Sequence, residues 1–141
     1  MSGTDTPPVR VFLVEDSPIV RLRLAEALTI PGTIEVVGEA DSEAEAVAAL
    51  RRTPWNALIL DLTLKQGSGL GVLKAIRPWR PPGAKIIVLT NYAATPMRQA
   101  SLAQGADLVL DKMHESHQVR EVLDAMARQV RAPRATDDSA P

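Results

Sequence analysis

Five short apolar runs alternate with five segments of helical pattern along this chain of 141 residues. The apolar runs fall at residues 9–14, 34–37, 56–61, 85–90 and 107–111, and their lengths are typical of β-strands. Strands that alternate with helices need crossover connections, which make the sheet parallel and place helices on both of its faces. The chain is therefore expected to adopt an α/β fold, with a doubly wound five-stranded parallel sheet and five helices.

The helical segments carry start signals that fix where they begin. Ser17-Pro18 supplies an N-cap followed by proline at the first helical position, and Ser42 with Glu45 forms a capping box. The last helix has the most regular apolar face, which comprises Val119, Val122, Leu123, Met126 and Val130. These patterns predict amphipathic helices that pack on the sheet.

The first helix shows how the pattern assigns sides. Val20, Leu24 and Leu28 recur at helical spacing and are expected to face the core, whereas Arg21 is expected to stay outside. Pro31-Gly32 is expected to end this helix, because proline and glycine are strong helix breakers.

Length and composition predict a single domain with one hydrophobic core. Apolar residues make up 45% of the chain and charged residues 23%, as is usual for globular proteins. The domain is expected to span residues 9–131, preceded by a flexible segment 1–8. The tail 132–141 contains two prolines and no periodic apolar face, which predicts disorder.

Charge and residue content exclude several classes of function. The net charge of −1 gives no electrostatic reason to expect direct binding to DNA or to a membrane. The absence of cysteine excludes disulfides, thiol catalysis and thiolate metal sites. No apolar stretch approaches the roughly 20 residues that span a bilayer, and the N-terminus lacks the pattern of a signal peptide. A cytoplasmic protein is therefore expected.

Polar residues stand at the carboxyl ends of four predicted strands. Glu15 and Asp16 follow the first strand, Asp61 ends the third, Thr90 ends the fourth and Lys112 follows the fifth. The carboxyl ends of parallel strands meet at one edge, where α/β proteins bind ligands. Three carboxylates brought together repel unless a cation lies among them, and oxygen ligands suit Mg²⁺. Because Lys112 and Thr90 can contact phosphoryl oxygens, the set predicts a carboxylate nucleophile, a divalent metal ion and a phosphoryl group.

Four motifs at these positions resemble the response regulator receiver domain of bacterial two-component signalling. They are VFLVEDSP, ALILDLTLKQGSGL, KIIVLTN and GADLVLDK, and the resemblance covers residues 9–130. It implies a flavodoxin-like fold with strand order 2-1-3-4-5. It also implies a non-enzymatic phosphoacceptor in a phosphorelay, which signals through contact with an output protein that the sequence does not name. Because the chain ends shortly after the last helix, a stand-alone receiver is expected.

The resemblance assigns a role to each site residue. Asp61 would be phosphorylated by a histidine kinase or a phosphotransfer protein. The Mg²⁺ ligands would be Glu15, Asp16, Asp61 and the main-chain carbonyl of Thr63. Thr90 and Lys112 would bind the phosphoryl group, and displacement of the Thr90 hydroxyl toward it would act as the switch.

Several positions depart from the family pattern. Glu15 replaces the commoner aspartate, Met113 replaces the usual proline after the lysine, and Val109 replaces the usual switch aromatic. Asn91 stands where the residue is normally very small, which is expected to hinder small phosphodonors. Tyr92 is a candidate to gate the pocket in place of the missing aromatic.

Two other functions compete with this prediction. The departures at Asn91, Val109 and Met113 leave room for a pseudo-receiver, which is a binding module that works without phosphorylation. A phosphatase of the haloacid dehalogenase type also uses a strand-end aspartate with Mg²⁺. That class places a second aspartate two positions later as general acid, whereas this chain has Thr63, which does no acid–base work at neutral pH.

Overall fold

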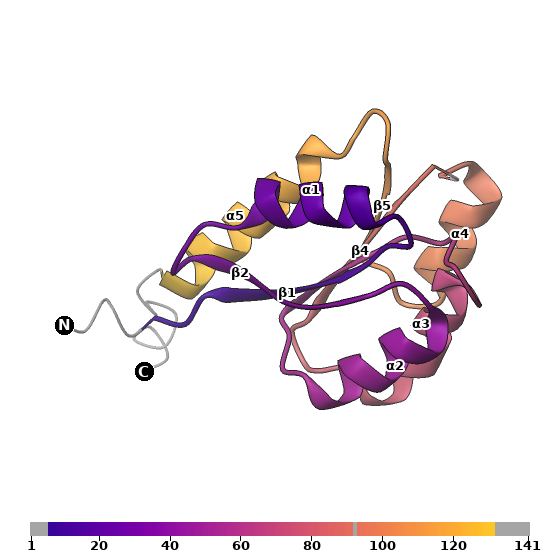
Figure 1. Ribbon diagram of the computed structural model, residues 1–141, viewed down its shortest axis with the longest axis horizontal. Coiled ribbons are helices and arrows are strands. Elements are labelled where there is room, and N and C mark those ends of the chain that lie inside the picture. Colours follow the sequence, from indigo (N-terminus) through magenta and orange to yellow (C-terminus); the bar gives the residue numbers. More distant parts are fainter. Residues whose placement is uncertain (1–5, 92, 132–141) are drawn as a thin grey trace, which may run out of the picture.

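The computed structural model describes residues 6–91 and 93–131, and it contains one parallel sheet (Figure 1). The strands are β1 (Val9–Val14), β2 (Ile34–Ala40), β3 (Ala57–Leu60), β4 (Lys85–Thr90) and β5 (Leu108–Asp111). Every neighbouring pair runs parallel, and the order is β2-β1-β3-β4-β5. The predicted fold class and strand order are confirmed.

Helices cover both faces of the sheet. They are α1 (Pro18–Leu28), α2 (Glu43–Arg52), α3 (Gly69–Ile76), α4 (Thr95–Ala103) and α5 (His117–Arg131), with a short 3-10 helix η2 (Arg77–Trp79) after α3. Figure 1 shows α1 and α5 on one side and α2, α3 and α4 on the other. The predicted caps of α1 and α2 are present, because Ser17 accepts from the Val20 N–H and Ser42 from the Glu45 N–H.

The core has two apolar layers, one on each face of the sheet. Successive strand residues point to opposite faces, so Phe12 and Leu58 pack under α2 and α3, whereas Leu13 and Ile59 pack under α1 and α5. All four of these side chains are buried. The central strands β3 and β4 are largely apolar on both faces for this reason, as expected for a parallel sheet, whereas the edge strand β2 carries exposed glutamates.

Several predicted boundaries differ from the structure. Helix α1 ends at Leu28 with Thr29 as its C-cap, ahead of the predicted stop, because residue 30 already forms a bridge to Ile34. Strand β2 continues to Ala40, beyond its predicted end at residue 37, through a register shift opposite Val11 and Phe12. Strand β3 stops one residue before Asp61, although the Asp61 N–H still donates to the Val14 carbonyl of β1 at 3.0 Å.

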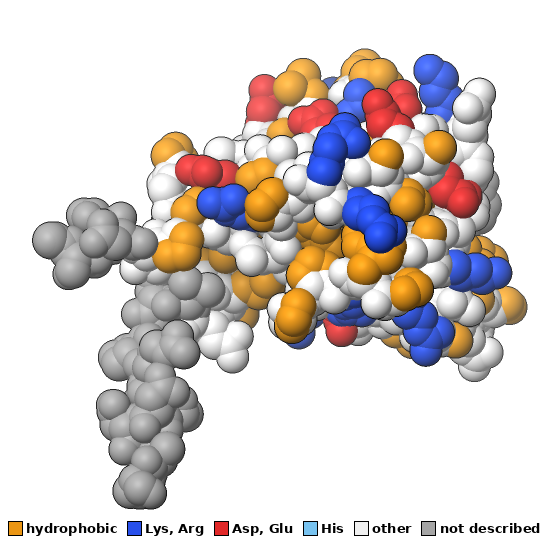
Figure 2. Space-filling view, turned by 90° about the horizontal axis from the view of Figure 1, so that it is seen from below, with side chains coloured by type: hydrophobic (Ala, Val, Ile, Leu, Met, Phe, Trp, Pro, Cys, Tyr) orange, Lys and Arg blue, Asp and Glu red, His pale blue; other side chains and the backbone are white. Residues whose placement is uncertain are grey.

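Positive and negative side chains are both present on the face of the molecule that Figure 2 shows. Figure 2 looks onto the side of α2 and α3, where Lys and Arg side chains lie among apolar side chains and carboxylates. Among the described residues, no helix combines the length and the apolarity that crossing a membrane requires.

Candidate functional site

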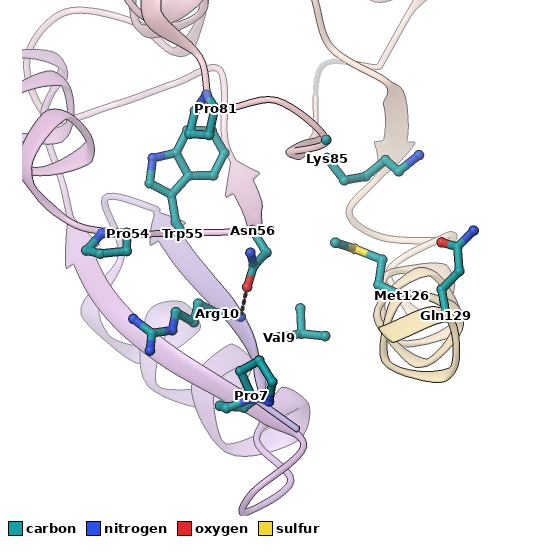
Figure 3. Close-up of a pocket in the computed structure, with 12 residues that line it drawn as sticks. Pro7, Val9, Arg10, Pro54, Trp55, Asn56, Pro81, Lys85, Met126 and Gln129 are labelled. Atoms are coloured by element: carbon teal, nitrogen blue, oxygen red, sulfur yellow. Dashed lines mark hydrogen bonds between the residues drawn. The ribbon is translucent and has the colours of Figure 1, made fainter. Parts of the chain in front are cut away.

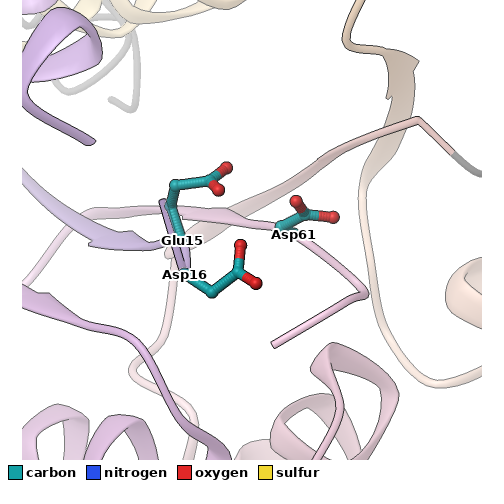
Figure 4. A group of neighbouring side chains, drawn as sticks. All are labelled: Glu15, Asp16 and Asp61. Atoms are coloured by element: carbon teal, nitrogen blue, oxygen red, sulfur yellow. The ribbon is translucent and has the colours of Figure 1, made fainter. Parts of the chain in front are cut away.

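Three carboxylates meet at the carboxyl edge of the sheet. Glu15 and Asp16 leave β1 and Asp61 leaves β3, and these neighbouring strands are in register to Val14 and Leu60. One carboxylate oxygen of each lies within 4.8 Å of the others (Figure 4). Glu15 and Asp61 are buried, at 3% and 6% exposure, whereas Asp16 is more accessible to solvent. The predicted acidic cluster therefore exists.

Lys112 reaches this cluster from the turn after β5. Its Nζ lies 2.7 Å from Glu15 Oε1 and 2.7 Å from Asp61 Oδ2, so one ammonium joins two buried carboxylates. Lys112 therefore lies at the predicted edge of the sheet, and its predicted contact with a phosphoryl group stays a prediction. Among the described residues, Lys112 is the one cation paired with the three carboxylates, so this part of the site keeps an excess of negative charge.

The pKa values of Glu15 and Lys112 are shifted in the same direction for different reasons. Burial raises the pKa of Glu15 above its ordinary value, even though hydrogen bonds from Lys112 and the Ser17 N–H oppose the rise. Burial alone would lower the pKa of Lys112, but hydrogen bonds to Asp61 and Glu15 outweigh it and raise that pKa. Lys112 is thus held as an ammonium. Further positive charge near Glu15 would stabilise the carboxylate form that burial disfavours.

The loop after Asp61 is tightly folded around that residue. Asp61 Oδ1 accepts a hydrogen bond from the Thr63 N–H at 3.2 Å. Gly69 packs so closely that a Cβ there would lie 2.2 Å from the Asp61 carbonyl oxygen, which only glycine permits. The Gly69 N–H also donates to the Leu62 carbonyl at 2.9 Å. The start of α3 therefore fixes the backbone that carries Asp61 and Thr63.

Thr90 lies next to the site and is fully buried. It pairs with Asp111 across β4 and β5, and its carbonyl accepts the Lys112 N–H at 2.9 Å. The cluster opens into a hollow of about 420 Å³ whose wall includes Asn91 and Met113 but not Thr90. The structure thus brings the acidic cluster, Thr63 and Lys112 to one pocket, with the Thr90 side chain in the adjoining core.

The positions that depart from the family pattern have distinct surroundings. Val109 is buried within the core, whereas Met113 is 76% exposed at the lip of the pocket. Arg98 of α4 donates to the Val109 carbonyl at 2.5 Å and so joins α4 to β5. The proposed gate Tyr92 lies outside the described residues.

Sequence reasoning missed the residues that fix the turn between β1 and α1. The prediction that Arg21 stays outside was wrong, because its Nη1 donates to the Glu15 carbonyl at 2.7 Å and its Nε contacts Glu39 Oε1 at 3.0 Å. Glu15 Oε2 also accepts the Ser17 N–H at 3.0 Å. No local pattern signals the Arg21 contact, since Glu39 belongs to the neighbouring strand.

A second hollow lies at the opposite, amino edge of the sheet. It measures about 650 Å³, and Pro7, Trp55 and Met126 are among the residues around it (Figure 3). Its described lining contains Arg10 and Lys85 but neither Asp nor Glu. Although this hollow is larger, its described lining offers no carboxylate nucleophile, so it does not compete with the acidic pocket as the place for the predicted phosphoryl chemistry.

Comparison with known sequences gives a consistent result. A model of the family described as response regulator receiver domain matches residues 11–124. The DNA-binding transcriptional activator DevR/DosR of Mycobacterium tuberculosis is 32% identical over 120 residues, which cover 84% of this chain and 55% of that protein. The photosynthetic apparatus regulatory protein RegA of Rhodovulum sulfidophilum is 34% identical over 116 residues, which cover 82% and 61%. This chain therefore spans only a little over half the length of these relatives.

Solved structures agree on the fold. A LuxR-family two-component response regulator from Aurantimonas sp. SI85-9A1 superposes with a TM-score of 0.76 at 25% identity, with 86% of each chain covered. The response regulator domain of Thermotoga maritima CheB superposes with a TM-score of 0.72 at 24% identity, covering 89% of this chain and 99% of that domain.

Proposed function

The chain belongs to the response regulator receiver domain family, and on that premise we propose that Asp61 accepts a phosphoryl group from a histidine kinase or a phosphotransfer protein. One observation carries the proposal. Asp61 is a buried carboxylate that faces an open pocket, and its Oδ2 lies 2.7 Å from the Lys112 ammonium. A nucleophile and a cation for the incoming phosphoryl oxygens are therefore adjacent.

The residues present fit a Mg²⁺ ion. Hard oxygen donors are the ligands that Mg²⁺ prefers, and the three carboxylates lie within 4.8 Å of one another. The raised pKa of Glu15 is a second sign that further positive charge is favourable there. Glu15, Asp16, Asp61 and the Thr63 carbonyl would hold the ion. When bound, it would supply charge neutralisation for the carboxylates and the transferring group.

The transfer itself follows from the roles of Asp61 and Lys112. An Asp61 carboxylate oxygen attacks phosphorus, an O–P bond forms, and the P–N bond to the donor histidine breaks with its electron pair left on the imidazole. The product is an acyl phosphate on Asp61. Lys112 gives up its contact with the attacking carboxylate and pairs with a phosphoryl oxygen, as a flexible ammonium can.

Thr90 is the proposed internal sensor of this change. Its side chain is fully buried and does not line the pocket, so we expect the end of β4 to move when its hydroxyl reaches a phosphoryl oxygen. Such a displacement would alter the packing of α4 on β5, where Arg98 donates to the Val109 carbonyl. A shift between two packings is an established form of switching in proteins.

The output is proposed to be altered affinity for another protein in the cytoplasm, without enzymatic turnover. The relative DevR/DosR is a DNA-binding transcriptional activator, and that activity belongs to the whole protein, 55% of which matches this chain. The net charge of −1 supports a protein partner for this chain in preference to DNA.

The test is phosphorylation of the wild type and of Asp61→Asn in the presence of Mg²⁺. A phosphorylated kinase, or acetyl phosphate, should add one phosphoryl group to the wild type and none to the variant, as measured by intact-protein mass spectrometry. Asp111→Asn is the matched control, because Asp111 also stands at a strand end but belongs to neither the acidic cluster nor the pocket wall. Equal labelling of the wild type and Asp61→Asn would end the proposal.

The choice of phosphodonor decides how well the experiment distinguishes a phosphorylated receiver from a pseudo-receiver. Asn91 lines the pocket and could exclude small donors, so the kinase experiment is decisive and acetyl phosphate is secondary. A wild type that accepts no phosphoryl group from any kinase, yet still binds a protein partner, would support the pseudo-receiver.

A further inference from the structure

The loop that follows Asp61 is joined to the start of α2 by several contacts. The Lys65 N–H donates to the Asp41 carbonyl at 3.0 Å, and the Glu43 N–H donates to the Gln66 carbonyl at 2.9 Å. Lys65 Nζ also lies 3.9 Å from Asp41 Oδ2. Two segments more than twenty residues apart in sequence therefore share one hydrogen-bonded seam.

The Glu43 side chain occupies the centre of this seam. Its Oε1 accepts the Ser68 N–H at 3.0 Å. A Cβ at Gly67 would lie 2.4 Å from the Glu43 Cβ, and a Cβ at Gly71 would lie 2.3 Å from Glu43 Oε1. Two glycines thus leave the space that the glutamate fills.

Gly71 is informative because it lies in the first turn of α3, where its N–H donates to Ser68 Oγ at 3.0 Å. Alanine is a better helix former than glycine. The side chain that Gly71 lacks leaves the space that Glu43 Oε1 uses. The carboxylate also lies at the N-terminal end of α3, where a negative charge is favoured.

The contact at Ser68 extends to the proposed metal ligand. Ser68 forms an isolated antiparallel bridge with Thr63, so the two ends of the loop are paired. Thr63 in turn donates its N–H to Asp61. The bridge is closed beside these two residues, where the Gly69 N–H donates to the Leu62 carbonyl at 2.9 Å, so the contact of Glu43 with Ser68 holds the segment that faces Thr63.

We propose that Glu43 is a positioning residue, which fixes the Thr63 main-chain carbonyl for Mg²⁺ by accepting the Ser68 N–H. This inference rests on the proposed function. Mg²⁺ demands near-octahedral geometry, so a carbonyl held in place before binding gives higher affinity than one that the ion must order. Glu43 touches neither the ion nor the phosphoryl group in this scheme and acts only through the loop.

The test is a Mg²⁺ titration in which backbone amide NMR signals report the binding. Glu43→Ala should weaken Mg²⁺ binding about fivefold, the equivalent of one hydrogen bond of about 1 kcal/mol. Glu43→Gln keeps an acceptor without the charge, so it should bind nearly as well as the wild type. If Glu43→Gln is as weak as Glu43→Ala, the effect comes from charge and the proposal fails.

Glu45→Ala is the matched control. Glu45 lies in the same helical turn, and its Oε1 accepts one backbone N–H, from Asp41, at 3.2 Å. Its removal costs α2 a similar hydrogen bond but leaves the contact at Ser68 intact, so Mg²⁺ affinity should stay at the wild-type value. A loss equal to that of Glu43→Ala would show that general loosening of α2 is responsible, and would overturn the proposal.

Gly71→Ala tests the same contact without removing the glutamate. The added methyl group would displace the flexible end of Glu43, while alanine favours the helix, so the variant should fold and still bind Mg²⁺ more weakly. In a Glu43→Ala background the same change should have no further effect. Unchanged affinity in the single variant contradicts the proposal.

A readout without metal separates this inference from the proposed function. In the Mg²⁺-free protein, the Ser68 amide should exchange with solvent faster in Glu43→Ala than in Glu43→Gln or the wild type. If the wild type binds no Mg²⁺, the proposed function fails. If it binds Mg²⁺ and Glu43→Ala matches it in affinity and exchange, only the positioning role fails.

Discussion

The two ends of the sheet each hold a cation paired with a carboxylate, and the pairs are built differently. At the carboxyl end, the Lys112 ammonium joins two buried carboxylates, Glu15 and Asp61, and Asp16 adds a third negative charge nearby. At the amino end, Arg80 Nη2 lies 2.6 Å from Asp107 Oδ2, one charge against one.

The amino-end pair is also completed by the backbone. Arg80 donates to the Gly105 carbonyl at 2.6 Å and to the Ala84 carbonyl at 2.7 Å, and Asp107 Oδ2 accepts the Ile86 N–H at 2.7 Å. A guanidinium suits several fixed partners, whereas an ammonium on a long chain is a mobile point charge. The pair of Arg80 and Asp107 therefore joins β4 to β5 with its charges balanced. The group of Lys112 and three carboxylates has unbalanced charge, so it can bind a cationic ligand.

Loss of Lys112 should produce the largest change in stability. Lys112→Met leaves two buried carboxylates without their cation, so the free energy of unfolding without metal should fall by about 3 kcal/mol. Mg²⁺ should restore most of this, because the ion supplies the missing charge. Urea unfolding with EDTA and with Mg²⁺ measures both values. If the free energy of unfolding falls equally with EDTA and with Mg²⁺, the proposed difference between the carboxyl end and the amino end of the sheet is wrong.

Loss of Arg80 should cost less and should not depend on metal. Arg80→Met removes the donors to two carbonyls and to a partly exposed carboxylate, which amounts to about 2 kcal/mol of unfolding free energy. The same titrations, with and without Mg²⁺, should give the same decrement. Recovery by Mg²⁺ would show that the amino end is coupled to the acidic pocket.

Neutralising Asp16 should have a smaller effect of opposite sign. Asp16→Asn relieves repulsion within the acidic cluster, so the metal-free protein should gain about 0.5 kcal/mol, while the stabilisation by Mg²⁺ shrinks. Thermal unfolding at several Mg²⁺ concentrations follows both changes in one experiment. A metal-free variant less stable than the wild type would mean that Asp16 has a structural role.

The smallest expected effect is a difference in pH dependence. Because the pKa of Lys112 is raised above 10.5, its contribution to stability is complete below pH 10.5 and is lost as the pH rises through the higher folded-state value. In EDTA, the wild type and Arg80→Met should both lose stability on this alkaline limb, and Lys112→Met should lose less. Parallel curves for all three proteins would contradict the assignment.

The sequence predicts the carboxyl-end site well because strand order and polarity place it. Once the apolar runs are assigned to parallel strands, Glu15, Asp61 and Lys112 must converge on one edge. The same reasoning cannot find the contact of Glu43 with Ser68 or the pair of Arg80 with Asp107. These side chains come from loops and helix ends whose relative positions depend on how the whole domain packs, and their separations of 25 and 27 residues follow no local period.

Local sequence patterns also cannot predict which side chains Lys112 contacts within the site. The sequence predicts that Lys112 binds a phosphoryl group, and the structure shows that Lys112 contacts Glu15 and Asp61. A long side chain selects its partners from everything within reach, which only the folded arrangement defines. The outward prediction for Arg21 fails for the same reason.

The separation of 97 residues between Glu15 and Lys112 has a consequence for how the chain matures. A ribosome synthesises the acidic residues first, and the lysine only with the last strand. Until β5 docks, the nascent carboxylates therefore lack their internal counter-charge. Closure of this long-range pair therefore requires β5 to be in place beside the rest of the sheet.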